Sequence, residues 1–246
     1  MAARRLRATP VERIWGRRDL PPGFPRPPGD EPIGEIWFEP PDGAELLVKY
    51  LFTSERLSIQ VHPDDAAARA GGHARGKDEA WYVIDAEPGA VIGLGLTREV
   101  SRGALRQAAL DGSIENLLDW RPVATGDLLY SPAGTIHAIG AGIALIEVQQ
   151  NVDLTYRLYD YGRPRELHLD EAVAVAKPGP WAPPSRSAFT LERLDAACAL
   201  DDGAVAVPLR SGGAIDGEPL VAGSVWSVVG SSALSGDVDV LVACPA

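Results

Sequence analysis

Short apolar runs dominate the sequence from residue 33 onward, and Gly, Pro and Asp residues separate them. Runs of this kind are typical of strands in a β-sandwich or a β-barrel. The predicted strands are 36–38, 45–52, 57–62, 80–84, 90–94, 128–130 and 144–149. This spacing predicts a mainly β protein and constrains the fold more than any other feature of the chain.

Two helical passages interrupt the predicted strands. Residues 101–120 are expected to form a short helical insertion, in which Ser101 and Ser113 cap successive helices by accepting hydrogen bonds from free backbone amides. A further short helix is expected over 170–176, with an acidic first turn and Asp170 as its cap. The helices therefore add to a unit that is built mainly from strands.

Proline-rich segments mark the boundaries between the predicted units. Residues 1–32 are expected to be an extended N-terminal segment, since six Pro lie in 20–32 and exclude a helix interior or a central strand there. Residues 33–176 form the main predicted domain, which carries the motifs described below. After a second proline-rich linker, residues 188–246 are expected to form a smaller β unit.

Composition and charge exclude several classes of protein. The 246 residues carry a net charge of −11, and an acidic chain repels the phosphate backbone of nucleic acids. No run of about 18 apolar residues predicts a transmembrane helix, and the N-terminus lacks the apolar core of a signal peptide. Cys198 and Cys244 are too few for a disulfide framework. We therefore expect a cytoplasmic protein, monomeric by default, that binds neither nucleic acid nor membranes.

The strand over 57–62 has one apolar face and one polar face. Side chains alternate along a strand, so Ser58, Gln60 and His62 point the same way. The polar face could simply meet water, as in many edge strands. In a small barrel it could instead line the lumen, where Gln60 and His62 could bind a metal ion side by side.

Two later segments supply further metal-binding side chains. Glu79 begins an apolar run, and His137 follows a Pro-x-Gly turn that leads into another strand. Separately, Glu79 could be a solvated strand end and His137 a buried structural histidine. Together with Gln60 and His62 they have the spacing by which cupins, the double-stranded β-helix proteins, build a mononuclear metal site. Imidazole and carboxylate donors without thiolate suit one Zn²⁺ or another divalent ion per chain.

Several longer blocks carry a resemblance to a known family. The blocks are RIWG, GEIWF, LSIQVHPDD, GKDEAWYVID, GDLLYSPAGTIHA and IEVQQNVDLTYRLYDYGR. Through them the chain resembles the type I phosphomannose isomerases of the cupin superfamily, and their short bacterial branch in particular. The likeness covers about 12–175 and is faint after 188. It implies a jelly-roll cupin domain, followed at 188–246 by a degenerate second cupin-like unit that binds no metal.

The resemblance also implies roles for individual residues. The implied metal ligands are Gln60, His62, Glu79 and His137. The implied catalytic residues are Arg157, Glu147, Lys77 and Asp153, and the implied phosphate contacts are Ser58 and Arg163. In addition, Glu147 and Gln149 alternate with apolar neighbours, so both are expected on the lumen face of their strand.

The implied reaction interconverts D-mannose 6-phosphate and D-fructose 6-phosphate by moving a proton between C1 and C2 through an enediol. Arg157 keeps its proton, so it can only stabilise negative charge. The base is therefore Glu147, Lys77, Asp153 or a metal-bound hydroxide, and the sequence does not choose among them.

The sequence leaves two alternatives to an isomerase open. A metal-dependent cupin of another reaction class, such as an oxygenase, usually offers iron two His and a carboxylate, and the Gln60 ligand speaks against it. A non-catalytic sugar-phosphate-binding cupin is the second alternative. Only about twenty residues separate GEIWF from SIQVH, where relatives carry a helical segment, so part of the wall of the site is expected to be missing.

The remaining histidines and the first tryptophans have simpler interpretations. His73 lies in a Gly-rich loop and is expected to be exposed, whereas His168 is expected to pack or to cap a helix. Trp15 and Trp37 are predicted to be core anchors near the edge of the sheet.

Overall fold

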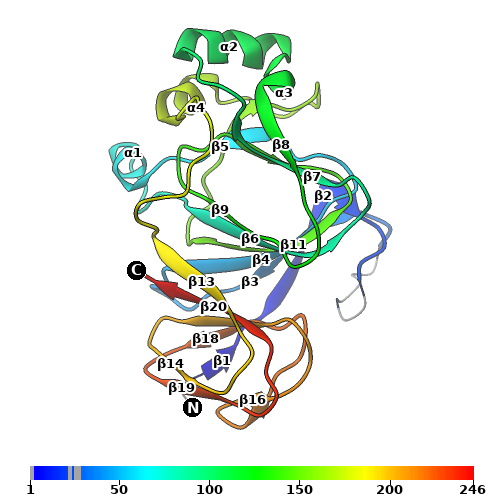
Figure 1. Cartoon of the computed structure of the whole chain (residues 1–246), viewed down its shortest axis with the longest axis vertical. Coiled ribbons are helices and arrows are strands. Elements are labelled where there is room, and N and C mark those ends of the chain that lie inside the picture. The colour runs from blue at the N-terminus through cyan, green and yellow to red at the C-terminus, as the bar shows by residue number, and fades with distance from the viewer. Residues whose placement is uncertain (1–2, 22–23, 25–28) are drawn as a thin grey trace.

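A computed structural model of the chain describes residues 3–21, 24 and 29–246. Sheets and helices are stacked in layers along the long axis, with three helices at one end and the smaller C-terminal β unit at the other (Figure 1). Within the described part of the chain, the longest helix has 10 residues, and no helix is long and apolar enough to cross a membrane.

A six-stranded antiparallel sheet lies in the middle of the stack. Its strands, in spatial order, are β2 (Ala8–Arg17), β3 (Ile33–Phe38), β4 (Leu46–Phe52), β11 (Ile143–Gln150), β6 (Glu79–Ala86) and β9 (Leu128–Ser131). Every residue of β4 is buried, because the sheet is covered on both faces. Val48 and Tyr50 pack toward the C-terminal unit, whereas Leu51 packs into the first barrel.

A five-stranded sheet faces the central sheet and closes the first barrel. Its order is β12 (Tyr156–Tyr159), β5 (Ile59–Val61), β10 (His137–Ile139), β7 (Val91–Leu96) and β8 (Leu118–Pro122). Trp81, Leu94 and Leu145 fill the apolar end of the space between the two sheets. This arrangement confirms the predicted mainly β fold.

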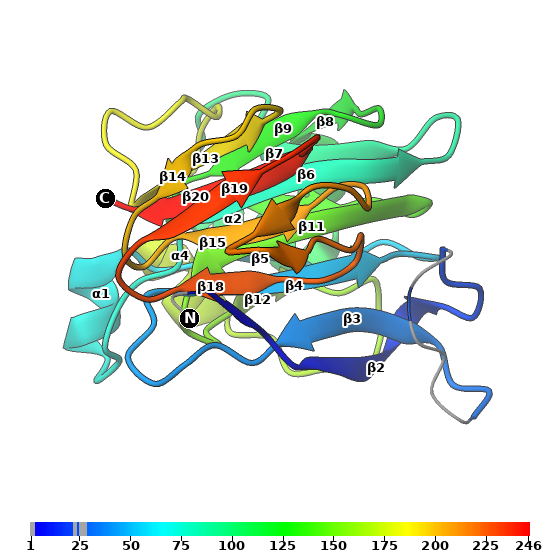
Figure 2. The same ribbon diagram turned by 90° about the horizontal axis from the view of Figure 1, so that it is seen from below.

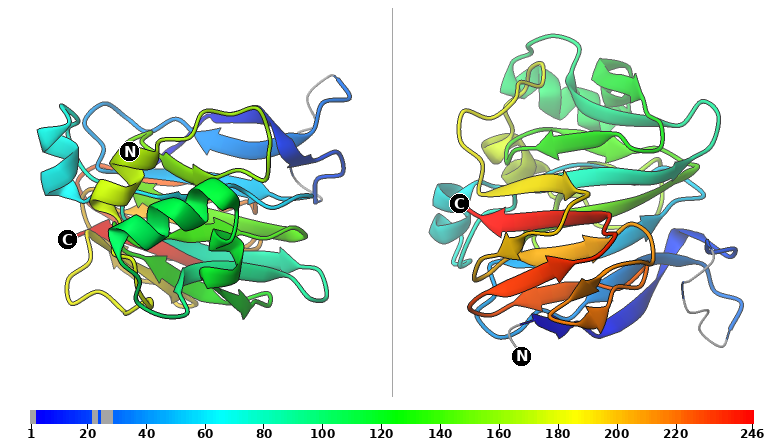
Figure 3. Two further views of the ribbon diagram at one scale, coloured as in Figure 1. Left: turned by 90° about the horizontal axis from the view of Figure 1, so that it is seen from above. Right: turned by 60° about the horizontal axis from the view of Figure 1, so that its bottom comes forward.

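Helices cover the outer face of the five-stranded sheet. They are α2 (Arg102–Asp111), α3 (Ile114–Leu117) and α4 (Leu169–Val175), and Figure 3 shows α2 and α4 lying across the sheet. Leu105 and Ile114 are fully buried against this face. The short helix α1 (Asp65–Ala70) lies to one side, next to the end of β5.

The C-terminal unit is a second, smaller sandwich, seen from below in Figure 2. One sheet contains β1 (Ala3–Arg5), β18 (Trp226–Val228), β15 (Val205–Pro208), β20 (Val240–Pro245) and β13 (Phe189–Leu194). The other contains β14 (Ala199–Leu200), β19 (Ser232–Ser235), β16 (Ala214–Ile215) and β17 (Glu218–Pro219). Its interior is apolar.

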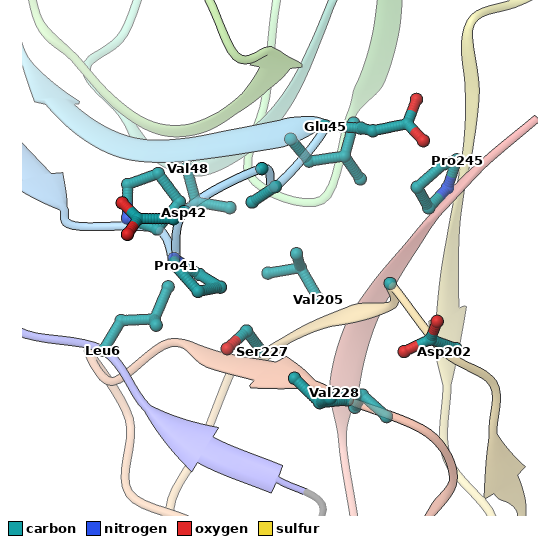
Figure 4. A pocket seen from close by; sticks show the side chains of 16 residues that line it. Leu6, Pro41, Asp42, Glu45, Val48, Asp202, Val205, Ser227, Val228 and Pro245 are labelled. Atoms are coloured by element: carbon teal, nitrogen blue, oxygen red, sulfur yellow. The ribbon is translucent and has the colours of Figure 1, made fainter.

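The two units share one apolar core between the central sheet and the sheet of β15 and β20. Ile36, Tyr50 and Ile146 contribute from the first unit, and Val207 and Leu241 from the second. At one side of this interface lies a cavity of about 360 Å³, lined by apolar side chains with carboxylates such as Asp42 and Asp202 at its rim (Figure 4). The cavity is separate from the polar site described below.

The N-terminal segment differs from the expected extended stretch. Residues 3–5 pair with β18 of the C-terminal unit, and 8–17 form the edge strand of the central sheet. The first residues therefore join both units. Most of the proline-rich stretch 20–32, namely 22–23 and 25–28, lies outside the described residues.

Two predicted helix caps are wrong, and one is confirmed. The Ser101 hydroxyl accepts a hydrogen bond from the Ala104 backbone N–H at 3.1 Å, as predicted. Ser113 makes no such bond, because its backbone is already helical (φ −66°, ψ −8°). Asp170 lies inside the first turn of α4, and His168 stands at the cap position. The predicted helical insertion over 101–120 is also shorter, since strand β8 begins at Leu118.

Candidate functional site

The four predicted metal ligands converge at the polar end of the first barrel. Gln60 and His137 are directly opposite each other on the neighbouring strands β5 and β10. His62 follows β5, and Glu79 begins β6 on the facing sheet. One donor atom each from His62, Glu79 and His137 can be chosen within 4.8 Å of one another. The barrel therefore brings together residues that are far apart in sequence.

Backbone carbonyls fix the orientation of both imidazole rings. Nδ1 of His62 lies 2.8 Å from the Leu154 carbonyl oxygen, and Nδ1 of His137 lies 3.0 Å from that of Thr135. Each Nδ1 must donate its N–H to the carbonyl, so each Nε2 presents a lone pair to the centre. Burial lowers the pKa of His62, and burial together with His62 lowers the pKa of His137 to about 4. Both rings are thus neutral, as metal ligands must be.

Glu79 faces both imidazoles with its carboxylate. Its Oε1 lies 3.2 Å from His62 Nε2 and its Oε2 lies 3.5 Å from His137 Nε2. Burial by itself raises the pKa of Glu79, but the positive charges around it, that of His62 when its ring is protonated and that of the Lys77 ammonium, lower the pKa well below its ordinary value. The Lys77 ammonium is 2.8 Å from Oε1. The carboxylate is therefore ionised and meets imidazole lone pairs, which is repulsive unless a cation lies between them.

The spacing of the donor atoms fits a small divalent cation. Ligands bound tetrahedrally at the usual zinc distances are about 3.3 Å apart, close to the two separations between Glu79 and the imidazoles. His62 Nε2 is buried and makes no hydrogen bond with the described residues. Gln60 Nε2 lies 3.2 Å from His137 Nε2, and turning the amide by 180° would present its oxygen instead. These residues fit a bound metal ion.

A second pair of buried charges lies beside the metal ligands. Lys49 is 3 % exposed, and its Nζ lies 3.6 Å from Oε1 of Glu147, while the Trp81 indole donates a hydrogen bond to Oε2 at 3.0 Å. Burial and the nearby charge of Glu79 raise the pKa of Glu147, against the opposing effect of Lys49. Glu147 therefore holds its proton more readily than an ordinary glutamate.

Three guanidinium groups line the cavity that opens from this centre. They belong to Arg13, Arg157 and Arg165, and the same cavity is lined by Ser58 and Asp153. The cavity thus borders the cluster of metal-binding donors and has three carboxylates outside that cluster and a cationic rim. This combination suits a small anionic substrate that must also reach a metal ion.

Neighbouring groups hold the guanidinium groups in place. Arg165 donates two hydrogen bonds to Asp160, at 2.6 and 2.7 Å. The Arg157 backbone N–H donates to Nδ1 of His168 at 3.2 Å, and the His168 backbone N–H donates to the Arg157 carbonyl at 2.9 Å. The Arg157 guanidinium donates to the Glu166 carbonyl at 3.2 Å.

Arg163 is the predicted site residue that the structure does not bring into this cavity. Its guanidinium pairs with Asp160 at 2.8 Å and with Glu55 at 3.6 Å, and it donates to the Arg56 carbonyl oxygen. Arg165 lines the cavity instead. The other predicted residues all line the cavity or contact its lining through Glu79.

Sequence reasoning missed four charged residues of the cavity and placed one residue wrongly. It did not select Arg13, Glu35, Lys49 or Arg165. A lysine within an otherwise apolar strand was a usable signal for Lys49, because an unpaired lysine is almost never fully buried. Trp37 was predicted to be a core anchor, but it lines the cavity, and the Lys49 ammonium lies 4.2 Å from its ring centroid. Trp15 also borders the cavity, but it is buried in an apolar core, as predicted, whereas Trp37 belongs to none.

Comparisons of sequence support the predicted resemblance. The chain is 42% identical over 156 residues to mannose-6-phosphate isomerase of Streptococcus mutans, covering 61% of this chain and 49% of the relative. It is 42% identical over 141 residues to mannose-6-phosphate isomerase ManA of Bacillus subtilis, covering 54% and 44%. The chain thus spans about half the length of these curated relatives. No family model matches it.

Comparisons of structure agree over the whole chain. The crystal structure of the mannose 6-phosphate isomerase from Bacillus subtilis has a TM-score of 0.81 and 26% sequence identity, covering 99% of this chain and 100% of that one. A zinc-bound mannose 6-phosphate isomerase has a TM-score of 0.72 at 15% identity, with complete coverage of both chains. The resemblance to phosphomannose isomerases and the mainly β, cupin-type fold are confirmed.

Proposed function

We propose that this chain is a zinc-dependent aldose–ketose isomerase that interconverts D-mannose 6-phosphate and D-fructose 6-phosphate. One observation carries the proposal: a small cavity lined by three arginines and by three carboxylates besides Glu79 adjoins the cluster of His62, Glu79 and His137. The similarity to mannose-6-phosphate isomerases supports the choice of substrate.

The metal would be held by Gln60, His62, Glu79 and His137. A zinc ion held there would supply Lewis-acid stabilisation of the negative charge that develops on substrate oxygen. Lys77 sits next to this position, with its ammonium on Glu79. Burial alone lowers the pKa of Lys77, but Glu79 and Glu147 raise it above its ordinary value, so Lys77 remains a cation. We infer that it donates hydrogen bonds to substrate oxygen and is not the base.

The proton between C1 and C2 must be moved by a group that can accept it. Glu147 and Asp153 are carboxylates that line the cavity and lie outside the metal-binding set. Either can take a proton from carbon at one face of the substrate and return it to the neighbouring carbon. Arg157 stays charged and stabilises the enediolate, because a guanidinium does not lose its proton.

The phosphate would bind at the cationic rim of the cavity. We infer that Arg165, which lines the cavity, does what the sequence had led us to expect of Arg163. Arg157 has no carboxylate within salt-bridge distance among the described residues, so its charge is available to an anion. Ser58 supplies a hydroxyl at the same cavity. Holding the remote phosphate fixes the reacting carbons near the base.

A coupled assay with mannose 6-phosphate, run together with metal analysis, tests the proposal. We expect turnover with about one zinc per chain, and a large loss of kcat in Arg157→Ala with the metal retained. Absence of turnover by the metal-loaded wild type would overturn the isomerase. Binding of mannose 6-phosphate without turnover would favour the non-catalytic alternative.

A further inference from the structure

The turn that carries His137 is bound on its outer side by the linker between the two units. We refer to residues 177–189 as the strap. The Lys177 backbone N–H donates to the Gly134 carbonyl at 2.8 Å, and its ammonium donates to the Ala133 carbonyl at 3.0 Å. The Trp181 indole donates to the Tyr130 carbonyl at 2.9 Å. The strap therefore satisfies three carbonyl groups along the segment that leads to His137.

Gly134 shows how closely this turn is packed. Its φ is +88°, a conformation that favours glycine. A Cβ at this position would meet the Lys177 side chain at 3.0 Å. On the inner side, the Gly134 N–H donates to the His62 carbonyl at 2.8 Å. The turn is thus held between the strap and one of the two imidazole ligands.

Asp78 joins the turn, the strap and the metal-binding strand. Its Oδ1 accepts a hydrogen bond from the Ala133 backbone N–H at 2.8 Å. Its Oδ2 accepts from the Tyr130 hydroxyl at 2.7 Å and from the Ala188 backbone N–H at 3.3 Å. The Tyr130 ring packs on Phe189, with ring centroids 5.3 Å apart. Asp78 also lies between Lys77 and Glu79 in the sequence, so one carboxylate connects all three parts.

We propose that Asp78 is a positioning residue for the metal centre and that it acts through the strap. By holding the 131–137 turn directly at Ala133, and at its start through the Tyr130 hydroxyl, it keeps His137 Nε2 directed at Glu79. The C-terminal unit, into which the strap leads, then has a role in shaping the site besides packing. This inference rests on the proposed metal centre but not on the identity of the substrate.

Zinc affinity, measured by competition with a chromophoric chelator, tests this role without an activity assay. We expect Asp78→Ala to weaken zinc binding about tenfold or more, as loss of a partner that orients a metal ligand commonly does. Asp78→Asn should remain within about threefold of wild type, because its amide oxygen can accept from Ala133 N–H and its amide N–H can donate to the Tyr130 oxygen.

Two further variants separate positioning from general stability. Asp239→Ala is the matched control, since Asp239 accepts two hydrogen bonds from Arg193 in the C-terminal unit, away from the turn. It should lower the unfolding midpoint and leave zinc affinity within about twofold. Tyr130→Phe keeps the ring on Phe189 but removes the hydroxyl, so it should weaken zinc binding less than Asp78→Ala does. This variant also provides the measurement if Asp78→Ala does not fold.

Each result has one meaning. Zinc affinity of Asp78→Ala and Tyr130→Phe equal to that of the wild type overturns the positioning role. So does a loss of affinity in Asp239→Ala as large as in Asp78→Ala. A wild type that binds no zinc overturns the metal centre itself, whereas a wild type that binds zinc but does not isomerise the sugar overturns only the proposed function.

Discussion

The interiors of the two units differ in what they bury. The first barrel encloses Lys49, Lys77, Glu79 and Glu147, each at most 5 % exposed. The interior of the C-terminal unit is built from apolar side chains, and the buried polar residues of 188–246 are serines. Burying a charge is unfavourable unless it is paired, and a buried pair is often no better for stability than apolar residues. The buried charges of the first barrel therefore indicate a functional site rather than a gain in stability. The interior of the second unit needs only apolar side chains that pack together.

Removal of the metal should produce the largest difference in behaviour between the two units. Dialysis against a chelator should lower turnover of mannose 6-phosphate on the order of 10⁴-fold, since a Lewis acid contributes several kcal/mol to such a step. Added zinc should restore the rate. Hydrogen exchange should show new mobility at 58–62 and 131–137 but not in 205–208 or 240–245. Equal loosening of both units would contradict the division of roles.

Replacement of the base should give the next largest effect. One of Glu147→Gln and Asp153→Asn should lower kcat about 10³-fold with zinc content unchanged, because general base catalysis contributes on that scale. The other should lower it less than about tenfold. As a control from the second unit, Ser232→Ala should leave kcat unchanged. If neither carboxylate variant loses activity, the base is neither Glu147 nor Asp153.

The cationic rim can be tested by comparing its two neighbouring arginines. Arg165→Ala should raise KM for mannose 6-phosphate about 10- to 100-fold, the range expected from a charge-assisted hydrogen bond. Arg163→Ala should raise it less than about threefold, because Arg163 does not line the cavity, although both arginines pair with Asp160. A larger increase in KM for Arg163→Ala than for Arg165→Ala would show that Arg163 contacts the phosphate.

The pH dependence of stability should come mainly from the first unit. His137 has a pKa of about 4 in the folded chain, below its ordinary value of 6.5. The unfolded chain therefore binds the proton more tightly, and stability is complete above pH 6.5 and falls as the pH drops toward 4. Between pH 7.5 and 5 the metal-free chain should lose about 2 kcal/mol from this group, measured by urea unfolding.

His137→Gln is the control for that measurement, because it removes the titrating group and keeps a polar side chain. It should show a correspondingly weaker dependence between the same two pH values. An unchanged dependence would assign the effect to other groups, of which His62, with its lowered pKa, is the nearest.

The metal-binding set could be predicted from sequence because local patterns encode it. Alternation along a strand places Gln60 and His62 on one face, and a Pro-x-Gly turn positions His137. The rim could not be predicted in the same way. Whether Arg163 or Arg165 reaches the cavity depends on a loop in which Tyr161 has a positive φ of 55°. Such a conformation is unusual for a tyrosine, and tertiary packing determines it.

Long-range pairing explains the other differences. Nothing near residues 3–5 in the sequence indicates that they pair with Val228, Ser227 and Trp226, more than 200 positions away. Trp37 looks like a core residue because its strand is apolar, but its face of the sheet borders the polar end of the barrel. Sequence periodicity shows which residues share a face, whereas only the closed barrel shows which end of that face is polar.

The central sheet limits where the chain can be truncated. Alternate residues of β4 and β11 pack into different hydrophobic cores, so these strands contribute to the cores on both faces of the central sheet. A fragment ending at residue 176 would keep every metal ligand, yet it would expose Ile36, Tyr50 and Ile146 on a broad sheet surface. Such a surface favours aggregation. The C-terminal unit is thus needed to keep this face of the central sheet covered, although it contributes no residue to the lining of the candidate site.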